Sequence, residues 1–122
     1  MLKSKLMNLT HKRILITAGE PSSISSEITI KALKILKNTI NAELIIVTDP
    51  KLIEFELENL NLSFKLNILN KNFNFKDYKK DCINIIPIKL KEKVFPGILN
   101  KKNSDFVINS IQNSVDLLLR KK

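Results

Sequence analysis

The sequence has 122 residues, of which 43% are hydrophobic and only two are glycine; this composition excludes an intrinsically disordered chain and fits one small domain or part of a larger one. No apolar run is long enough to predict a membrane span. The formal net charge is +9, but nearly all of the basic residues are lysines spread along the chain, without an arginine-rich stripe interleaved with aromatic side chains, so nucleic-acid binding is not the expected function.

The start of the chain and its single cysteine bear on localisation. Residues 1–13 are basic but contain no sustained apolar core and no small-residue cleavage site, which argues against a secretory signal. A frayed bacterial N-terminus is favoured over an organelle-targeting leader. Cys82 has no second cysteine to pair with, and its apolar surroundings favour a buried structural thiol over a nucleophile. The expected location is therefore the cytoplasm.

The first predicted elements are a strand and a helix. Residues 13–17 form a short apolar run that is typical of a buried strand. Residues 26–41 change to a helical period, and Ser25 or Ser26 can cap the start of this helix. The apolar face of the predicted helix consists of Ala32, Leu33, Leu36 and Ile40.

A second strand and helix follow directly. Residues 42–48 are a continuous apolar run that again predicts a strand. Asp49 followed by Pro50 predicts an N-cap and the first position of a second helix, which should end near residues 59–61. The predicted buried stripe of that helix is Leu52, Ile53, Leu57 and Leu60.

Two more strands are expected in the middle of the chain. Residues 63–69 alternate in polarity and predict a half-buried strand, whereas the asparagine-rich residues 70–81 predict a loop or a poorly ordered excursion. Residues 83–88 predict another strand, in which Pro87 marks an edge or a strand end. The buried side of the alternating strand should carry Phe64, Leu66 and Ile68.

A last helix should begin at Asn103 or Ser104 and continue through Arg120. The resulting order of elements, with helices between successive strands, predicts an α/β fold with a mostly parallel sheet and flanking helices. No internal repeat or domain boundary is evident, so residues 1–122 should form one unit. The predicted buried stripe of the last helix is Val107, Ile111, Val115 and Leu118.

Three blocks of this sequence match a known family in the right order. Residues 16–27 read ITAGEPSSISSE, residues 47–54 read VTDPKLIE, and residues 96–119 begin with PGILNKKN. Together they resemble the N-terminal portion of the 4-hydroxythreonine-4-phosphate dehydrogenase family, which has a strand, then T-P-G-[DE]-P-A-G-I-G-P-[DE], then a helix. The matching positions are Thr17, Gly19, Glu20, Pro21, Ile24, Glu27, Pro96, Gly97, Leu99, Asn103, Phe106 and Val107.

The resemblance implies an oxidoreductase of pyridoxal phosphate biosynthesis. Such an enzyme uses NAD and a divalent metal to oxidise 4-phosphooxy-threonine, a small-molecule substrate, with subsequent decarboxylation. Its fold is the two-domain isocitrate- and isopropylmalate-dehydrogenase-like architecture, and its active site lies between domains at a homodimer interface. By the same resemblance, Gly19 allows close backbone approach to the nicotinamide, and Glu20 and Pro21 shape the cleft.

The same turn also has a purely structural interpretation, in which its serines cap the following helix. Ser23 and Ser25 stand where the family has its two later glycines. If those positions have positive φ, serine there costs about 1 kcal/mol or more each, and it adds a side chain where a ligand should approach. The departure from the family pattern therefore favours the structural interpretation of this turn.

Three further residues have alternative roles. Glu27 could be a site residue by resemblance, although a carboxylate in a first helical turn more often complements the helix dipole. Asp49 is expected to be a capping residue. Asn103 could orient the last loop, as the family match suggests, or act as an N-cap.

The resemblance covers only about the first third of the family's length. The three metal-binding histidines and the residues that hold the substrate lie beyond it, and His11 corresponds to none of them. No catalytic or metal-binding residue is therefore assigned, and no cofactor is assigned to this chain by itself. We expect a truncated or split enzyme that is inactive by itself and is completed by a C-terminal chain. The alternative is a non-enzymatic α/β module that binds a nucleotide or a protein.

A unit of this size leaves sheet edges and an interdomain face uncovered. We therefore expect the isolated chain to be marginally stable, prone to aggregation or dependent on a partner. Thermal unfolding combined with analytical ultracentrifugation measures both properties. A sharp two-state melt of a monodisperse monomer would contradict this expectation.

Overall fold

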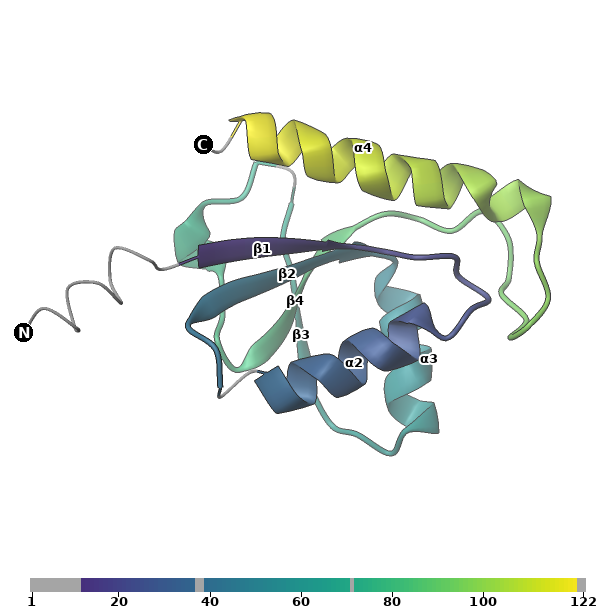
Figure 1. The fold of residues 1–122 in the computed structure, drawn as a ribbon, viewed down its shortest axis with the longest axis horizontal. Helices are drawn as coiled ribbons and strands as arrows, with labels where there is room; N and C mark the ends of the chain where they lie inside the picture. Colours follow the sequence, from purple (N-terminus) through teal and green to yellow (C-terminus); the bar gives the residue numbers. More distant parts are fainter. Residues whose placement is uncertain (1–11, 37–38, 71, 121–122) are drawn as a thin grey trace, which may run out of the picture.

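Four parallel strands form the centre of the part of the chain that the structure describes, in the order β1-β2-β4-β3 (Figure 1). The structure is a computed structural model, and it describes residues 12–36, 39–70 and 72–120. The strands are β1 (Lys12–Thr17), β2 (Ala42–Thr48), β3 (Lys65–Ile68) and β4 (Cys82–Pro87). The helices are α2 (Ser25–Leu36), α3 (Pro50–Asn59) and α4 (Ser104–Arg120), with short 3-10 turns η1 (Phe75–Asp77) and η2 (Lys101–Asn103).

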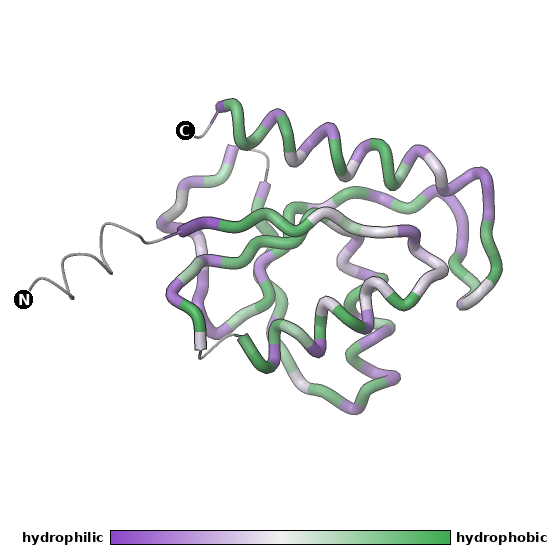
Figure 2. Tube along the Cα trace, viewed as in Figure 1, coloured by the Kyte–Doolittle hydropathy of each residue, from purple (hydrophilic) through white to green (hydrophobic). Residues whose placement is uncertain are grey.

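The predicted fold class, an α/β sheet with flanking helices, is confirmed. All three strand pairs are parallel, with Ile16 opposite Ile46 and Val47 opposite Ile86. The central strands β2 and β4 are mostly buried, which explains why their sequences are largely apolar (Figure 2). Pro87 ends β4, as its missing N–H group requires.

The helices divide between the two faces of the sheet. Helices α2 and α3 lie together on one face, and α4 lies across the other (Figure 1). Alternate residues of β2 therefore enter different cores. Leu44 and Ile46 pack with Ile30 of α2, whereas Ile45 and Val47 share the second core with α4.

Helix α2 is described through Leu36, and Thr39 and Ile40 lie in a turn and bend, so the helix does not continue to residue 41 as the sequence pattern predicts. The side-chain hydroxyl of Thr39 donates to the carbonyls of Ile35 and Leu36, and the backbone N–H of Ile40 also donates to Leu36. These bonds satisfy the last carbonyls of the helix and close it. Helix α3 begins where the sequence predicts.

The prediction for β3 is wrong at its end. Ile68 is 50% exposed, whereas the next residue, Leu69, is only 2% exposed. Strand β3 is an edge strand, so neighbours cover it from one side only. The N–H of Leu69 donates to the carbonyl of Ile85. Its side chain joins the core on the α4 side, although the alternation predicts no buried side chain of this strand on that side.

Residues 72–81, before β4, form a loop that contains the short turn η1, which is the first of the two predicted alternatives. Phe73 is buried in the core, although its neighbours in the sequence are polar. The buried amide of Asn84 donates to the carbonyls of Lys79 and Cys82 and accepts from the Lys79 N–H and from Asn67. The two bonds with Lys79 attach the loop to the sheet, and the other two lie within the sheet.

Helix α4 packs through a different face from the one that its apolar residues predict. Its buried residues are Phe106, Ser110, Ser114 and Leu117. Three residues of the predicted buried stripe, Ile111, Val115 and Leu118, are instead 50%, 48% and 57% exposed. The physical reason is the small size of the serines, which lets the helix approach the ends of β1 and β2 closely.

Ser110 makes the contact that fixes this orientation. It is fully buried, and its hydroxyl accepts from the Ala18 N–H at 2.8 Å and donates to the Val47 carbonyl at 3.1 Å. One side chain therefore joins the helix to two neighbouring strand ends. Within the described residues, no helix has the length and apolar character needed to cross a membrane.

Replacing Ser110 tests the importance of this contact. Ser110→Ala removes the hydroxyl and should lower the free energy of unfolding by about 1–2 kcal/mol. Gln112→Ala, on the exposed side of the same helix, should change it by less than about 0.5 kcal/mol. Urea denaturation of both variants measures the difference, and equal effects would contradict the role given to Ser110.

Candidate functional site

The carboxyl ends of β1, β2 and β4 meet at one edge of the sheet, where ligands bind in open parallel α/β folds. The turn after β1 begins at Ala18, Asp49 follows β2, and residues 88–94 follow β4. All three sequence blocks that resemble the dehydrogenase family contribute to this edge. It is therefore the candidate functional site.

The Gly19-Glu20-Pro21 turn is held together by its own serines. The Glu20 carboxylate accepts from the N–H of Ser22 at 2.9 Å and from the Ser22 hydroxyl. The Glu20 carbonyl accepts from the hydroxyl of Ser23 at 2.7 Å. Pro21 and Ser22 are buried. The polar groups of this turn are thus bonded to one another.

Gly19 is required by close packing. A Cβ at this position would lie 2.8 Å from both Cβ and Oγ of Ser25, at the start of α2. Packing against Ser25 is therefore enough to explain why Gly19 matches the family pattern. Neither Ser23 nor Ser25 has a positive φ, so the expected backbone cost of serine at these positions is absent.

A small cavity lies beneath this turn. Its volume is about 10 Å³, and Gly19, Ser25, Ser26 and Thr48 are among its lining residues. The Thr48 hydroxyl is buried there and has no hydrogen-bond partner in the structure. This volume suits one water molecule and is too small for a phosphate group.

A larger groove lies next to it, between the start of α3 and the segment after β4. It has a volume of about 680 Å³, within the range of small-molecule sites. Phe55, Leu90 and Val94 give it an apolar lining. Its lysines outnumber its two carboxylates, so the groove suits a negatively charged ligand. The charged lining residues are Asp49, Lys51, Lys89, Lys91, Glu92 and Lys93.

Asp49 builds one wall of the groove. Its Oδ1 accepts from the Lys51 N–H at 2.9 Å, which confirms it as the N-cap of α3. Its Oδ2 accepts from the N–H of Leu90 at 2.9 Å. The buried carboxylate therefore also holds the segment after β4 against the start of α3.

Asn103 fixes the far end of the same segment. Its Oδ1 accepts from the N–H of Glu92 at 3.0 Å, and its Nδ2 donates to the Glu92 carbonyl at 3.3 Å. Of the two roles open for Asn103 in the sequence, the structure supports orientation of the loop. Gly97 has a φ of +80°, which favours glycine, and its N–H donates to Ser22 in the turn after β1.

Glu27 interacts with side chains of α2 and α3. It forms an ion pair with Lys31 at 2.8 Å, one helical turn away. Partial burial, followed by the charge of Glu27, raises the pKa of Glu56 on α3 above its usual range. The ion pair lies within α2 and the interaction with Glu56 joins α2 to α3, and none of these three residues lines the groove.

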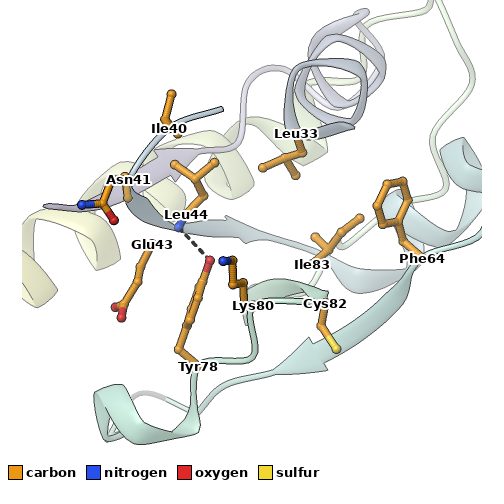
Figure 3. Close-up of a pocket in the computed structure, with 11 residues that line it drawn as sticks. Leu33, Ile40, Asn41, Glu43, Leu44, Phe64, Tyr78, Lys80, Cys82 and Ile83 are labelled. Atoms are coloured by element: carbon orange, nitrogen blue, oxygen red, sulfur yellow. Dashed lines mark hydrogen bonds between the residues drawn. The ribbon is translucent and has the colours of Figure 1, made fainter. Parts of the chain in front are cut away.

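A second pocket opens at the opposite edge of the sheet, near the amino ends of β2 and β4 (Figure 3). Its volume is about 260 Å³. Tyr78 accepts from the N–H of Leu44 at 3.2 Å, and Glu43 pairs with Arg13 at 3.0 Å. Cys82 lines this pocket and is half-buried. The sequence predicts a buried thiol, and the residue is less buried than that because it is the first residue of β4.

Sequence reasoning missed both the groove and this pocket. The alternation of lysine with apolar residues in KLKEKV, residues 89–94, was the available signal for the groove, since it directly follows a predicted strand. Among the described residues, no three His, Cys, Asp or Glu side chains lie together as a possible metal site. His11 lies outside the described residues.

The close contact between Gly19 and Ser25 can be tested with a pair of substitutions. Gly19→Ala should lower the free energy of unfolding by about 1–3 kcal/mol, because the added methyl meets Ser25. Ser25→Gly in the same chain should recover at least half of that loss. Gly97→Ala, which meets no atom within 4 Å but has a positive φ, serves as the control that Ser25→Gly should not rescue. Chemical denaturation measures all of these, and absence of rescue at Gly19 would contradict the steric explanation.

Comparison with known proteins adds independent information about this chain. No model of a known protein family matches it. The chain is similar to 4-hydroxythreonine-4-phosphate dehydrogenases of Wigglesworthia glossinidia brevipalpis, with 36% identity over 81% of this chain and 29% of the relative, and of Shewanella frigidimarina, with 32% identity over 83% and 30%. The Yersinia pestis enzyme of the same name is 26% identical over 90% of this chain and 32% of its own length.

A solved structure agrees at the level of the fold. The crystal structure of a 4-hydroxythreonine-4-phosphate dehydrogenase from Burkholderia phymatum matches with a TM-score of 0.73 and 18% identity, over 91% of this chain and 33% of that one. The chain thus spans about 30% of the length of the curated relatives that it matches. These similarities confirm the predicted resemblance to the 4-hydroxythreonine-4-phosphate dehydrogenase family over most of this chain.

Proposed function

We propose that this chain is the amino-terminal part of an NAD-dependent 4-hydroxythreonine-4-phosphate dehydrogenase, which oxidises 4-phosphooxy-threonine in pyridoxal phosphate biosynthesis. The observation that carries the proposal is the lysine-rich groove at the carboxyl ends of β2 and β4. The names of the relatives support the type of reaction, and the position of the groove fits ligand binding in a parallel α/β sheet.

The residues of this chain would bind and orient a ligand. Lys51 and Lys89 would attract a phosphate group, such as those of the cofactor, from the two sides of the groove. Phe55 and Leu90 would contact an apolar part of the same ligand. The Gly19-Glu20-Pro21 turn would border the cofactor through its backbone shape, because its side chains and serines are already bonded to one another.

The other parts of the reaction would come from elsewhere. The described residues offer no set of metal ligands, so the divalent metal would be held by residues outside them. NAD, when bound, would accept the hydride from the substrate. We therefore propose that the isolated chain is inactive, and that it works together with the remaining length of the family in a homodimeric, cytoplasmic enzyme.

The binding part of the proposal is tested by titrating the purified chain with NAD. The double variant Lys51→Ala/Lys89→Ala should weaken binding by about tenfold, because it removes two of the charges that line the groove. Lys34→Ala, an exposed lysine on α2, is the matched control and should leave the affinity unchanged. Absence of NAD binding, or equal affinity in all variants, would overturn the assignment of the groove.

The same protein tests the division of labour. With NAD, 4-phosphooxy-L-threonine and Mg²⁺, the isolated chain should form no NADH. Turnover by the chain alone would show that it holds a complete site. If a chimera that joins the chain to the remaining part of a relative binds NAD but produces no NADH, the non-enzymatic nucleotide-binding alternative is supported instead.

A further inference from the structure

The outward face of α4 is an apolar surface that the described fold does not cover. We name it the α4 stripe, and its members are Ile108, Ile111, Val115, Leu118 and Leu119. The first four are spaced by three, four and three residues, which places them on one side of the helix. Their exposed fractions range from 48% to 57%, and Leu119 is 63% exposed.

This stripe is additional to the face that packs on the sheet. The inner face already carries Phe106 and Leu117 in the core, and Ser110 fixes its orientation through two hydrogen bonds. The helix cannot rotate to bury the stripe without breaking those bonds. Helix α4 is thus apolar on two faces, which is typical of a helix that lies between two packed layers.

The open edge of the sheet lies beneath the same helix. Strand β1 pairs with β2 on one side and has no neighbouring strand among the described residues on the other. Figure 1 shows α4 lying along the side of the sheet where β1 is, and contacts join the two elements. An apolar helix face and an unpaired strand edge therefore occur in one region of the molecule.

The α4 stripe by itself is too small to hold a stable symmetric dimer of this chain. A helix of 17 residues is about 25 Å long and about 10 Å wide, so one face offers roughly 250 Å². A stable symmetric dimer buries about 800 Å² per partner. A partner that covers the α4 stripe stably must also contact neighbouring surfaces.

The length of the relatives supplies such a partner. The Burkholderia phymatum structure matches 91% of this chain with only 33% of its own length, and the curated relatives are matched over about 30%. We propose that the α4 stripe is the surface on which the remaining polypeptide of a 4-hydroxythreonine-4-phosphate dehydrogenase packs. This inference depends on the proposed function in one respect, which is the identity of the polypeptide that covers the stripe.

Thiol protection in a chimera tests this packing. The chimera places this chain in the position of the matched region of the full-length Wigglesworthia glossinidia brevipalpis relative, with all native cysteines replaced. Val115→Cys should react with a thiol reagent at least tenfold more slowly in the chimera than in this chain alone. Ile35→Cys, on the exposed side of α2, is the matched control and should react equally fast in both.

Each result is decisive for the stripe. Protection of Val115→Cys without protection of Ile35→Cys supports the proposal, whereas equal reactivity of Val115→Cys in the two proteins overturns it. Self-association of this chain alone that Ile111→Gln abolishes would also overturn it, in favour of a second copy. Circular dichroism of each protein confirms folding before labelling.

Enzyme activity separates this inference from the proposed function. If Val115→Cys is protected in a folded chimera that forms no NADH, the packing surface stands and the proposed enzymatic role fails. If the chimera is active but Val115→Cys remains fully reactive, the enzymatic role stands and the α4 stripe is not the packing surface.

Discussion

The buried hydroxyl of Ser110 fixes the position of helix α4 on the sheet, and several other features of the molecule depend on that position. It accepts from Ala18, the first residue after β1, and donates to Val47 near the end of β2. Because both partners are backbone groups at strand ends, the helix axis must pass close to the sheet at this point. Ser110 and Ser114 permit that approach because their side chains are small. The choice of inner face then leaves the α4 stripe exposed.

The candidate site depends on backbone connections between segments that are far apart in the sequence. Asp49 holds Leu90 from 41 positions away, and Asn103 holds Glu92 from 11 positions away. Both polar side chains are buried and fully used in these contacts, so their roles are to position the segment between them. The lysines of that segment then face a groove at the ligand-binding edge of the sheet.

The turn after β1 combines one close packing contact with hydrogen bonds among its own residues. Gly19 keeps the close contact with α2 that its missing side chain allows, while the serines beyond it bond to Glu20 and to one another. The Burkholderia phymatum structure shares this fold at only 18% identity. Packing requirements such as that of Gly19 restrict individual positions strongly. Most other positions need only a matching pattern of polar and apolar residues.

The sequence by itself determined the elements and their order, because local signals suffice for them. The apolar run at 42–48 and the Asp49-Pro50 start of α3 are examples, and both are where the sequence predicts. Only the tertiary structure decided which face of α4 is buried, because the contacts of Phe106 and Leu117 with the core and of Ser110 with two strand ends are long-range and leave no local pattern. The groove also required the tertiary structure, because its walls come from segments that only long-range hydrogen bonds bring together.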